Sequence, residues 1–149
     1  MSHQDDIREF QKKFGQLSFN TPGHLTWRKL QERIECMQEE LQEFIAAAAV
    51  QDLEEQADAL VDLVYFAIGT ATMLGLPWDK LWADVHRANM EKEAGIGKRN
   101  HLVDCIKPEG WVGPRTAEIL KEAGYSKYQR DQEETHRDDP YYLSPFDNL

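Results

Sequence analysis

The chain has 149 residues, a formal net charge of −10 at pH 7 and 41% hydrophobic residues, which suits one compact domain. Such an acidic chain is unsuited to nucleic-acid polymers, because proteins that bind them need a basic face. The sequence start lacks the basic and apolar segments of a signal peptide, and the longest apolar stretch is short for a bilayer span. We therefore expect a cytoplasmic protein that contacts no membrane, in which Cys36 and Cys105 stay as thiols.

Apolar residues at helical spacing predict an all-α protein. A short amphipathic helix is expected over residues 5–14, followed by a loop over 15–24. Thr26 is a suitable N-cap for a long second helix that ends near Val50. A third helix is expected over 53–74, where a glycine follows.

The rest of the chain is less regular. A fourth helix is expected over 78–93, an irregular loop over 94–113 and a short fifth helix over 114–124. We expect a four-helix-bundle-like fold with short accessory helices over residues 1–125, and an irregular C-terminal tail over 126–149.

The second predicted helix carries glutamates at 39, 40 and 43. At about 100° per residue, Glu40 and Glu43 lie about 60° apart on one face, and Glu40 flanks the apolar stripe near Phe44. Taken alone, this pattern indicates a solvated acidic face, because glutamate is a good helix former. Glu40 and Glu43 could also converge on one ion near the interior of the bundle.

The third predicted helix favours the metal interpretation. Glu55, Asp58 and Asp62 fall within about 60° of one another around its axis, and Asp62 lies in the most apolar part of the sequence. A buried carboxylate without a partner is costly, so Asp62 needs a cation, a proton or a hydrogen-bond partner such as Tyr65. The helix contains no Lys or Arg, and the short turn before it makes it antiparallel to the second helix. The acidic side chains then face each other, and a divalent metal ion would stabilise them.

Carboxylate oxygens are the ligands that Mg²⁺ and Mn²⁺ prefer. The histidines and cysteines do not show the spacing of a zinc site. We therefore expect a Mg²⁺ site that Mn²⁺ also fits, with ligands among the acidic residues of the two helices: Glu40, Glu43, Glu55, Asp58 and Asp62.

These acidic residues form two motifs, EExxE at 39–43 and ExxD at 55–58. Together they resemble the signature of the all-α nucleoside triphosphate pyrophosphatases, the MazG-like superfamily, which includes dimeric dUTPase-like and phosphoribosyl-ATP pyrophosphohydrolase enzymes. VHRANMEK at 85–92 and KPEGW at 107–111 resemble it as well. The similarity covers roughly residues 30–120, is greatest to small single-domain bacterial and phage members, and implies a MazG-type fold with metal-dependent pyrophosphohydrolase activity.

The third-helix ligands align with the family motif in two ways. In the literal ExxD, the pair is Glu55 and Asp58. Many members have an apolar segment directly after the Asp; aligned on it, the Asp is Asp62 and Ala59 takes the Glu position. We expect Asp58 and Asp62 to be the ligands, with Glu55 in reserve.

The fourth predicted helix ends in a basic stretch that continues into the next loop. Asn89 and Lys92 are three residues apart and can reach one ligand together, although an ordinary solvated helix end also favours Lys. The resemblance implies that this stretch binds the substrate's phosphates through Arg87, Asn89, Lys92, Lys98 and Lys107. Any of Trp27, Trp78, Trp82 and Trp111 could stack on a base, although most buried aromatic side chains belong to the core.

These patterns favour a metal-dependent (deoxy)nucleoside triphosphate pyrophosphohydrolase that acts on the nucleotide pool. Water would attack the α-phosphorus in line and pyrophosphate would leave, with Glu39 or Glu43 orienting or deprotonating the water. Two alternatives stay open: a phosphoribosyl-ATP pyrophosphohydrolase, and a non-enzymatic, metal-stabilised nucleotide-binding adaptor.

The third helix is apolar nearly all round over 60–71, and one short chain cannot easily cover it. Members of the resembled family assemble into dimers or tetramers with active sites near subunit boundaries. We therefore expect a homodimer or homotetramer with aromatic residues in its contacts: Trp78, Trp82, Tyr141, Tyr142 and Phe146.

Overall fold

The computed structural model describes residues 2–16, 18–95 and 104–126, and this part of the chain is mostly helical, as the sequence predicts. The elements that it contains are α1 (His3–Lys13), α2 (Trp27–Ala49), α3 (Leu53–Met73), α4 (Trp78–Met90), β1 (Glu93–Gly95), β2 (Asp104–Ile106) and α5 (Thr116–Glu122). Lys98 lies outside the described residues, and so do residues 127–149 of the predicted tail.

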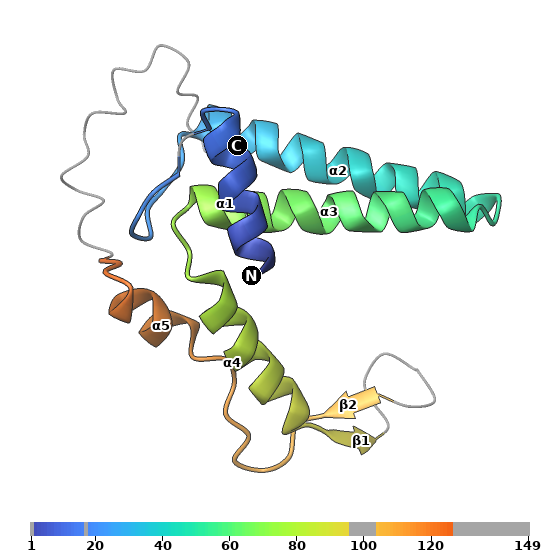
Figure 1. Ribbon diagram of the computed structural model, residues 1–149. Helices are drawn as coiled ribbons and strands as arrows, with labels where there is room; N and C mark the ends of the chain where they lie inside the picture. The colour runs from blue at the N-terminus through green and yellow to red at the C-terminus, as the bar shows by residue number, and fades with distance from the viewer. Residues whose placement is uncertain (1, 17, 96–103, 127–149) are drawn as a thin grey trace, which may run out of the picture.

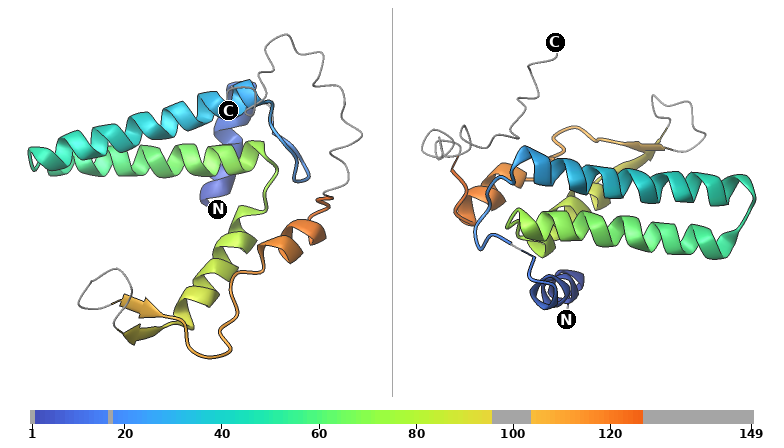
Figure 2. Two further views of the ribbon diagram at one scale, coloured as in Figure 1. Left: turned by 180° about the vertical axis from the view of Figure 1, so that it is seen from behind. Right: turned by 90° about the horizontal axis from the view of Figure 1, so that it is seen from above.

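The two long helices α2 and α3 form an antiparallel hairpin. Thr26 caps α2 as predicted, because its side chain accepts a hydrogen bond from the backbone N–H of Lys29 at 3.3 Å. Asp52 caps α3 in the same way, and Gln51 takes a φ of 57° that reverses the chain in a short turn. α2 and α3 therefore lie side by side along their length (Figures 1 and 2).

α1 crosses the open end of this hairpin and packs on the C-terminal half of α3 (Figure 1). Its Ile7 is fully buried, and two buried glutamines beside it bind the α3 segment directly. Gln4 Nε2 donates to the carbonyl oxygen of Leu76 at 2.9 Å, and Gln11 Nε2 donates to that of Gly69 at 2.9 Å. Polar contacts as well as apolar burial therefore hold α1 in place.

The chain bends by 118° between α3 and α4, so α4, the β-hairpin and α5 form a second arm that leaves the helical hairpin (Figures 1 and 2). In the part of the chain that the structure describes, the two long helices consequently form an open layer and not a closed four-helix bundle. None of the helices in the described ranges is by itself long and apolar enough to cross a membrane; only α3 and α4 taken together across their bend reach that length and hydropathy.

The interpretation of residues 94–113 as an irregular loop is wrong at 94–95 and 104–106, where β1 and β2 pair antiparallel with Ala94 opposite Cys105. Residues 107–113 are irregular, as predicted. Each strand has three residues, too few to show the alternation that predicts a strand. The pairing is close: a Cβ added at Gly95 would lie 2.7 Å from Ile106 Cδ1. The formation of β1 also explains why α4 ends at Met90, three residues before the predicted end.

Gly75 follows α3 with a φ of 68°, and a Cβ added there would collide with the backbone oxygen of Thr21. We expect Gly75→Ala to lower the free energy of unfolding by about 3 kcal/mol or more, since the clash adds to the cost of a left-handed residue, about 1–2 kcal/mol. Gly15→Ala is the matched control, because Gly15 has a φ of 64° but open space around it. Urea denaturation compares the two variants, and equal losses would contradict the clash.

Candidate metal and phosphate site

The acidic motifs meet along the helical hairpin, around Glu40. The pKa of Glu40 is raised above its usual value, first by partial burial and then by the negative charges of Glu43, Asp62, Glu39 and Asp58. Four of the predicted acidic residues therefore lie close enough to Glu40 to affect its pKa, two of them on α2 and two on α3.

Two features of this cluster differ from the sequence interpretation. Asp62 is exposed and not buried, because α2 packs along one side of the middle of α3 and leaves the other side open, where Val61 and Val64 are exposed too. Glu55 lies in the first turn of α3 next to the Asp52 cap, and its charge is not among those that raise the pKa of Glu40. The structure thus gathers Asp58 and Asp62 with Glu40, and leaves Glu55 apart.

The donor set suits a hard divalent cation, since it consists of carboxylate oxygens alone. Among the described residues, however, no group of three His, Cys, Asp or Glu side chains lies close enough to enclose a metal ion as it stands. Within the same ranges, the ion pairs of the molecule also leave Glu40, Glu43, Asp58 and Asp62 unneutralised. One chain therefore presents an open acidic face, and not a closed metal cage.

The predicted phosphate ligands gather on the second arm, around Trp111. Lys92 Nζ donates to Asn89 Oδ1 at 2.8 Å and lies 5.6 Å from the centroid of the Trp111 ring. Lys107 Nζ lies 4.6 Å from the same ring. The structure therefore brings Asn89, Lys92 and Lys107 together, and gives Trp111 an organising place that the sequence did not indicate.

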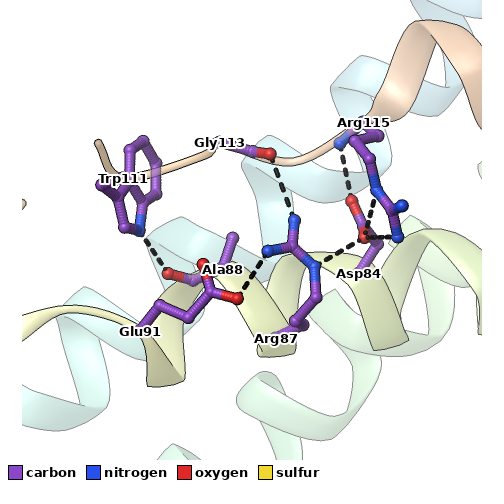
Figure 3. A network of polar contacts seen from close by, with 7 residues as sticks. All are labelled: Asp84, Arg87, Ala88, Glu91, Trp111, Gly113 and Arg115. Atoms are coloured by element: carbon purple, nitrogen blue, oxygen red, sulfur yellow. Dashed lines mark hydrogen bonds and ion pairs between the residues drawn. The ribbon is translucent and has the colours of Figure 1, made fainter.

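Arg87 is engaged inside the protein. Its Nε donates to Asp84 Oδ1 at 3.0 Å, one terminal nitrogen donates to Glu91 at 2.8 Å, and the other donates to the carbonyl oxygen of Gly113 at 3.2 Å (Figure 3). These bonds occupy all three nitrogens of the guanidinium group. In this arrangement Arg87 connects α4 to the segment after β2. Of the predicted phosphate-binding cations that the structure describes, Lys92 and Lys107 remain available for an anionic ligand.

Sequence reasoning missed Asp84 and Arg115, which bind each other across the same segment. A signal existed for Asp84, because it shares the buried side of α4 with Ala88, four residues on. Nothing local pointed to Arg115, which is 31 residues away from Asp84 in the sequence.

The carboxylates and the lysines lie on different arms of one chain (Figures 1 and 2). The sequence's resemblance to the all-α nucleotide pyrophosphohydrolases predicts both parts, the acidic helical hairpin and the basic end of the fourth helix. The family model described as phosphoribosyl-ATP pyrophosphohydrolase matches residues 7–89, more than half of the chain.

The chain therefore belongs to the phosphoribosyl-ATP pyrophosphohydrolase family, within the MazG-like superfamily of all-α nucleoside triphosphate pyrophosphatases. The match spans both acidic helices and most of α4, and it stops before Lys92, Lys107 and Trp111. A comparison with curated proteins found no match.

The raised pKa of Glu40 predicts a stability effect that needs no activity assay. A raised pKa means that the folded state holds the proton more tightly than the unfolded state. The stabilising contribution is thus complete below the ordinary pKa of glutamate and is lost as the pH rises through the raised value. At neutral pH, Glu40→Gln should therefore raise the midpoint of thermal unfolding of the metal-free protein.

The control for this measurement is Glu39→Gln, because Glu39 is an exposed neighbour on the same helix. Its charge raises the pKa of Glu40 less than the charges of Glu43 and Asp62 do. It should change the midpoint less. A lower midpoint for Glu40→Gln in EDTA at neutral pH would show that the carboxylates around Glu40 do not repel one another.

Proposed function

We propose that the protein is a Mg²⁺-dependent (deoxy)nucleoside triphosphate pyrophosphohydrolase that converts a triphosphate and water into a monophosphate and pyrophosphate. The main support is the cluster of unneutralised carboxylates around Glu40, contributed by both long helices of the fold. Such a cluster is unfavourable by itself, and binding of divalent cations would relieve the repulsion. Family membership supports pyrophosphohydrolysis as the reaction class.

In this proposal Glu40, Glu43, Asp58 and Asp62 hold the metal, with Glu55 as a further candidate one turn before Asp58. Bound Mg²⁺ would neutralise charge on the phosphate oxygens and lower the pKa of the attacking water; Mn²⁺ would also serve. Glu39 or Glu43, whichever is not used in ligation, orients or deprotonates the water. Lys92 and Lys107 bind the departing pyrophosphate, and Asn89 holds the Lys92 ammonium group in place.

Phosphoribosyl-ATP is the second candidate substrate, because the matching family model carries that name. The same carboxylates and lysines would serve either reaction, since both cleave the bond between the α- and β-phosphates. Supplying each common (d)NTP and phosphoribosyl-ATP in parallel, and measuring pyrophosphate released, separates the two. A chain that binds nucleotides but releases no pyrophosphate would instead be an adaptor.

We expect Glu40→Gln, Glu43→Gln and Asp62→Asn each to lower kcat by about a hundredfold or more, because each removes a charged metal ligand. Helical content should stay unchanged, and EDTA should abolish wild-type activity until Mg²⁺ or Mn²⁺ is restored. Glu54→Gln is the control, as Glu54 is an exposed acid on α3 outside the cluster. Wild-type turnover in all three variants at saturating Mg²⁺, or cleavage between the β- and γ-phosphates, would refute this mechanism.

We also propose that the active enzyme is a homodimer or homotetramer. Apolar side chains remain exposed on both long helices and on α4, including Leu41, Ile45, Val61, Val64 and Trp82, whose exposed fractions run from 45% to 64%. An apolar hollow of about 300 Å³ between α1 and α3, lined by Ile7, Leu60, Val61 and Val64 among others, continues this surface. A second copy would cover these side chains and would close the acidic face, which one chain leaves open.

Such a pairing could also place the lysines of one subunit beside the carboxylates of the other. Mixing the Glu40→Gln variant with a Lys92→Ala variant tests this idea directly. If each site combines the two chains, subunit exchange should restore roughly a quarter of the wild-type activity, because half of randomly mixed dimers carry one intact site.

Sedimentation at low micromolar concentration should show a dimer or tetramer, and Val64→Glu should dissociate it, whereas Val50→Glu at the hairpin tip should not. A fully active monomer would refute both the assembly and the shared site. A dimer without recovery on mixing would refute the shared site alone.

A further inference from the structure

The segment from Lys107 to Arg115 follows β2, and its part from Trp111 to Arg115 is fastened to α4 by a network of polar contacts (Figure 3). Asp84 is at its centre, with 5% of its side chain exposed. Its Oδ1 accepts hydrogen bonds from Arg115 at 2.7 and 3.1 Å and from Arg87 at 3.0 Å, and its Oδ2 accepts from the backbone N–H of Arg115 at 2.6 Å. One carboxylate therefore binds the α4 arginine and the far end of the segment at the same time.

Two further contacts fasten the middle of the segment. Arg87 donates to the carbonyl oxygen of Gly113 at 3.2 Å, and the indole nitrogen of Trp111 donates to the carbonyl oxygen of Ala88 at 2.7 Å. A Cβ added at Gly113 would lie 3.3 Å from the Trp111 ring, so the glycine leaves room for that ring beside the backbone. The segment is thus held at Arg115, at Gly113 and at Trp111, all against one helix.

The held segment carries Lys107, and the helix that holds it leads to Lys92. Both ammonium groups lie beside the Trp111 ring, at 4.6 and 5.6 Å from its centroid. Two cations near one ring repel each other, so their approach depends on a rigid support and on attraction to the ring face. Asp84, Arg87 and Arg115 provide that support without touching either lysine in the described structure.

We propose that Asp84 is a positioning residue for phosphate binding: with Arg87 and Arg115 it fixes the segment 107–115 so that Lys107 and Lys92 grip one pyrophosphate group. The identity of the ligand as the substrate's pyrophosphate rests on the proposed function. Hydrogen bonds from Arg87 and then from Arg115 hold the pKa of Asp84 well below its usual range. The carboxylate stays charged at neutral and mildly acidic pH, and its contacts are lost only in strong acid.

The network is separate from the core that holds the helical hairpin together. That core consists of the buried side chains of α1 and of the C-terminal half of α3, together with Ala47 of α2 and Ala59 of α3. Asp84 instead binds a segment beyond the residues that the family model matches. Loss of the network should therefore loosen the segment without unfolding the hairpin.

The test uses the full-length protein and inorganic pyrophosphate with Mg²⁺ as the probe in calorimetry, together with KM and kcat. Asp84→Asn and Arg115→Ala should each raise the Kd for pyrophosphate and the KM about tenfold, and leave kcat within about twofold. Arg115→Lys should fall between these variants and the wild type, because it keeps the positive charge beside Asp84 but loses the guanidinium group that donates twice to Oδ1. Asp79→Asn, an exposed acid on the same helix, should behave as the wild type.

Each outcome decides between the positioning role and the proposed function. Unchanged pyrophosphate affinity in Asp84→Asn and Arg115→Ala, or no pyrophosphate binding by the wild type, overturns the positioning role. A wild type that hydrolyses no nucleotide, yet binds pyrophosphate in an Asp84-dependent way, overturns the proposed function and supports the positioning role. If Asp84→Asn loses its helical signal, Arg115→Ala decides, because the Arg115 side chain is 59% exposed and its loss removes one partner only.

Discussion

Carboxylates on two antiparallel helices repel one another, and the other contacts of the fold have to hold these helices together against that repulsion. Glu40 lies within reach of Glu43 on its own helix and of Asp58 and Asp62 on the other, and its raised pKa records the unfavourable charge. Polar contacts and α1 stabilise the opposite end of the hairpin. There Arg33 of α2 donates to Thr70 Oγ1 and to the carbonyl oxygen of Phe66, and α1 packs across α3. In the acidic half itself, the two helices still pack against each other, with the small side chains of Ala47 and Ala59 buried.

This division of the hairpin explains where apolar residues stay exposed. The buried residues of α3 run from Ile68 to Met73, with Ala59 as the one further member in that helix. The exposed apolar side chains of α3, such as Val61 and Val64, flank Asp62 at the edge of the area that α1 covers. A surface that is apolar beside acidic residues suits a protein partner that also brings cations, and the lysines of a second copy would supply them.

The sequence predicted what local spacing controls. The helices, the Thr26 cap and the end of α3 at Gly75 follow from periodicity and from capping chemistry within a few residues. The exposure of Asp62 could not be predicted in this way, because it depends on which elements cover α3. Gln4 and Gln11 likewise look like surface residues in the sequence, and their burial depends on carbonyl groups 58 or more residues away. The contact between Asp84 and Arg115 has the same character, since charge pairs across 31 residues leave no periodic signal.

The basic residues show why a family motif assigns residue types more reliably than roles. Arg87 lies within a segment that resembles a phosphate-binding motif, yet its planar group makes three contacts inside the protein. A guanidinium group has a fixed fork of donors and is well suited to joining a carboxylate and a carbonyl group at once. Lys92 and Lys107 have flexible stems and compact charges, which can follow a phosphate group as it changes during hydrolysis. In the described part of the second arm, therefore, Arg87 and Arg115 build the frame, and Lys92 and Lys107 are the cations that we propose for the anion.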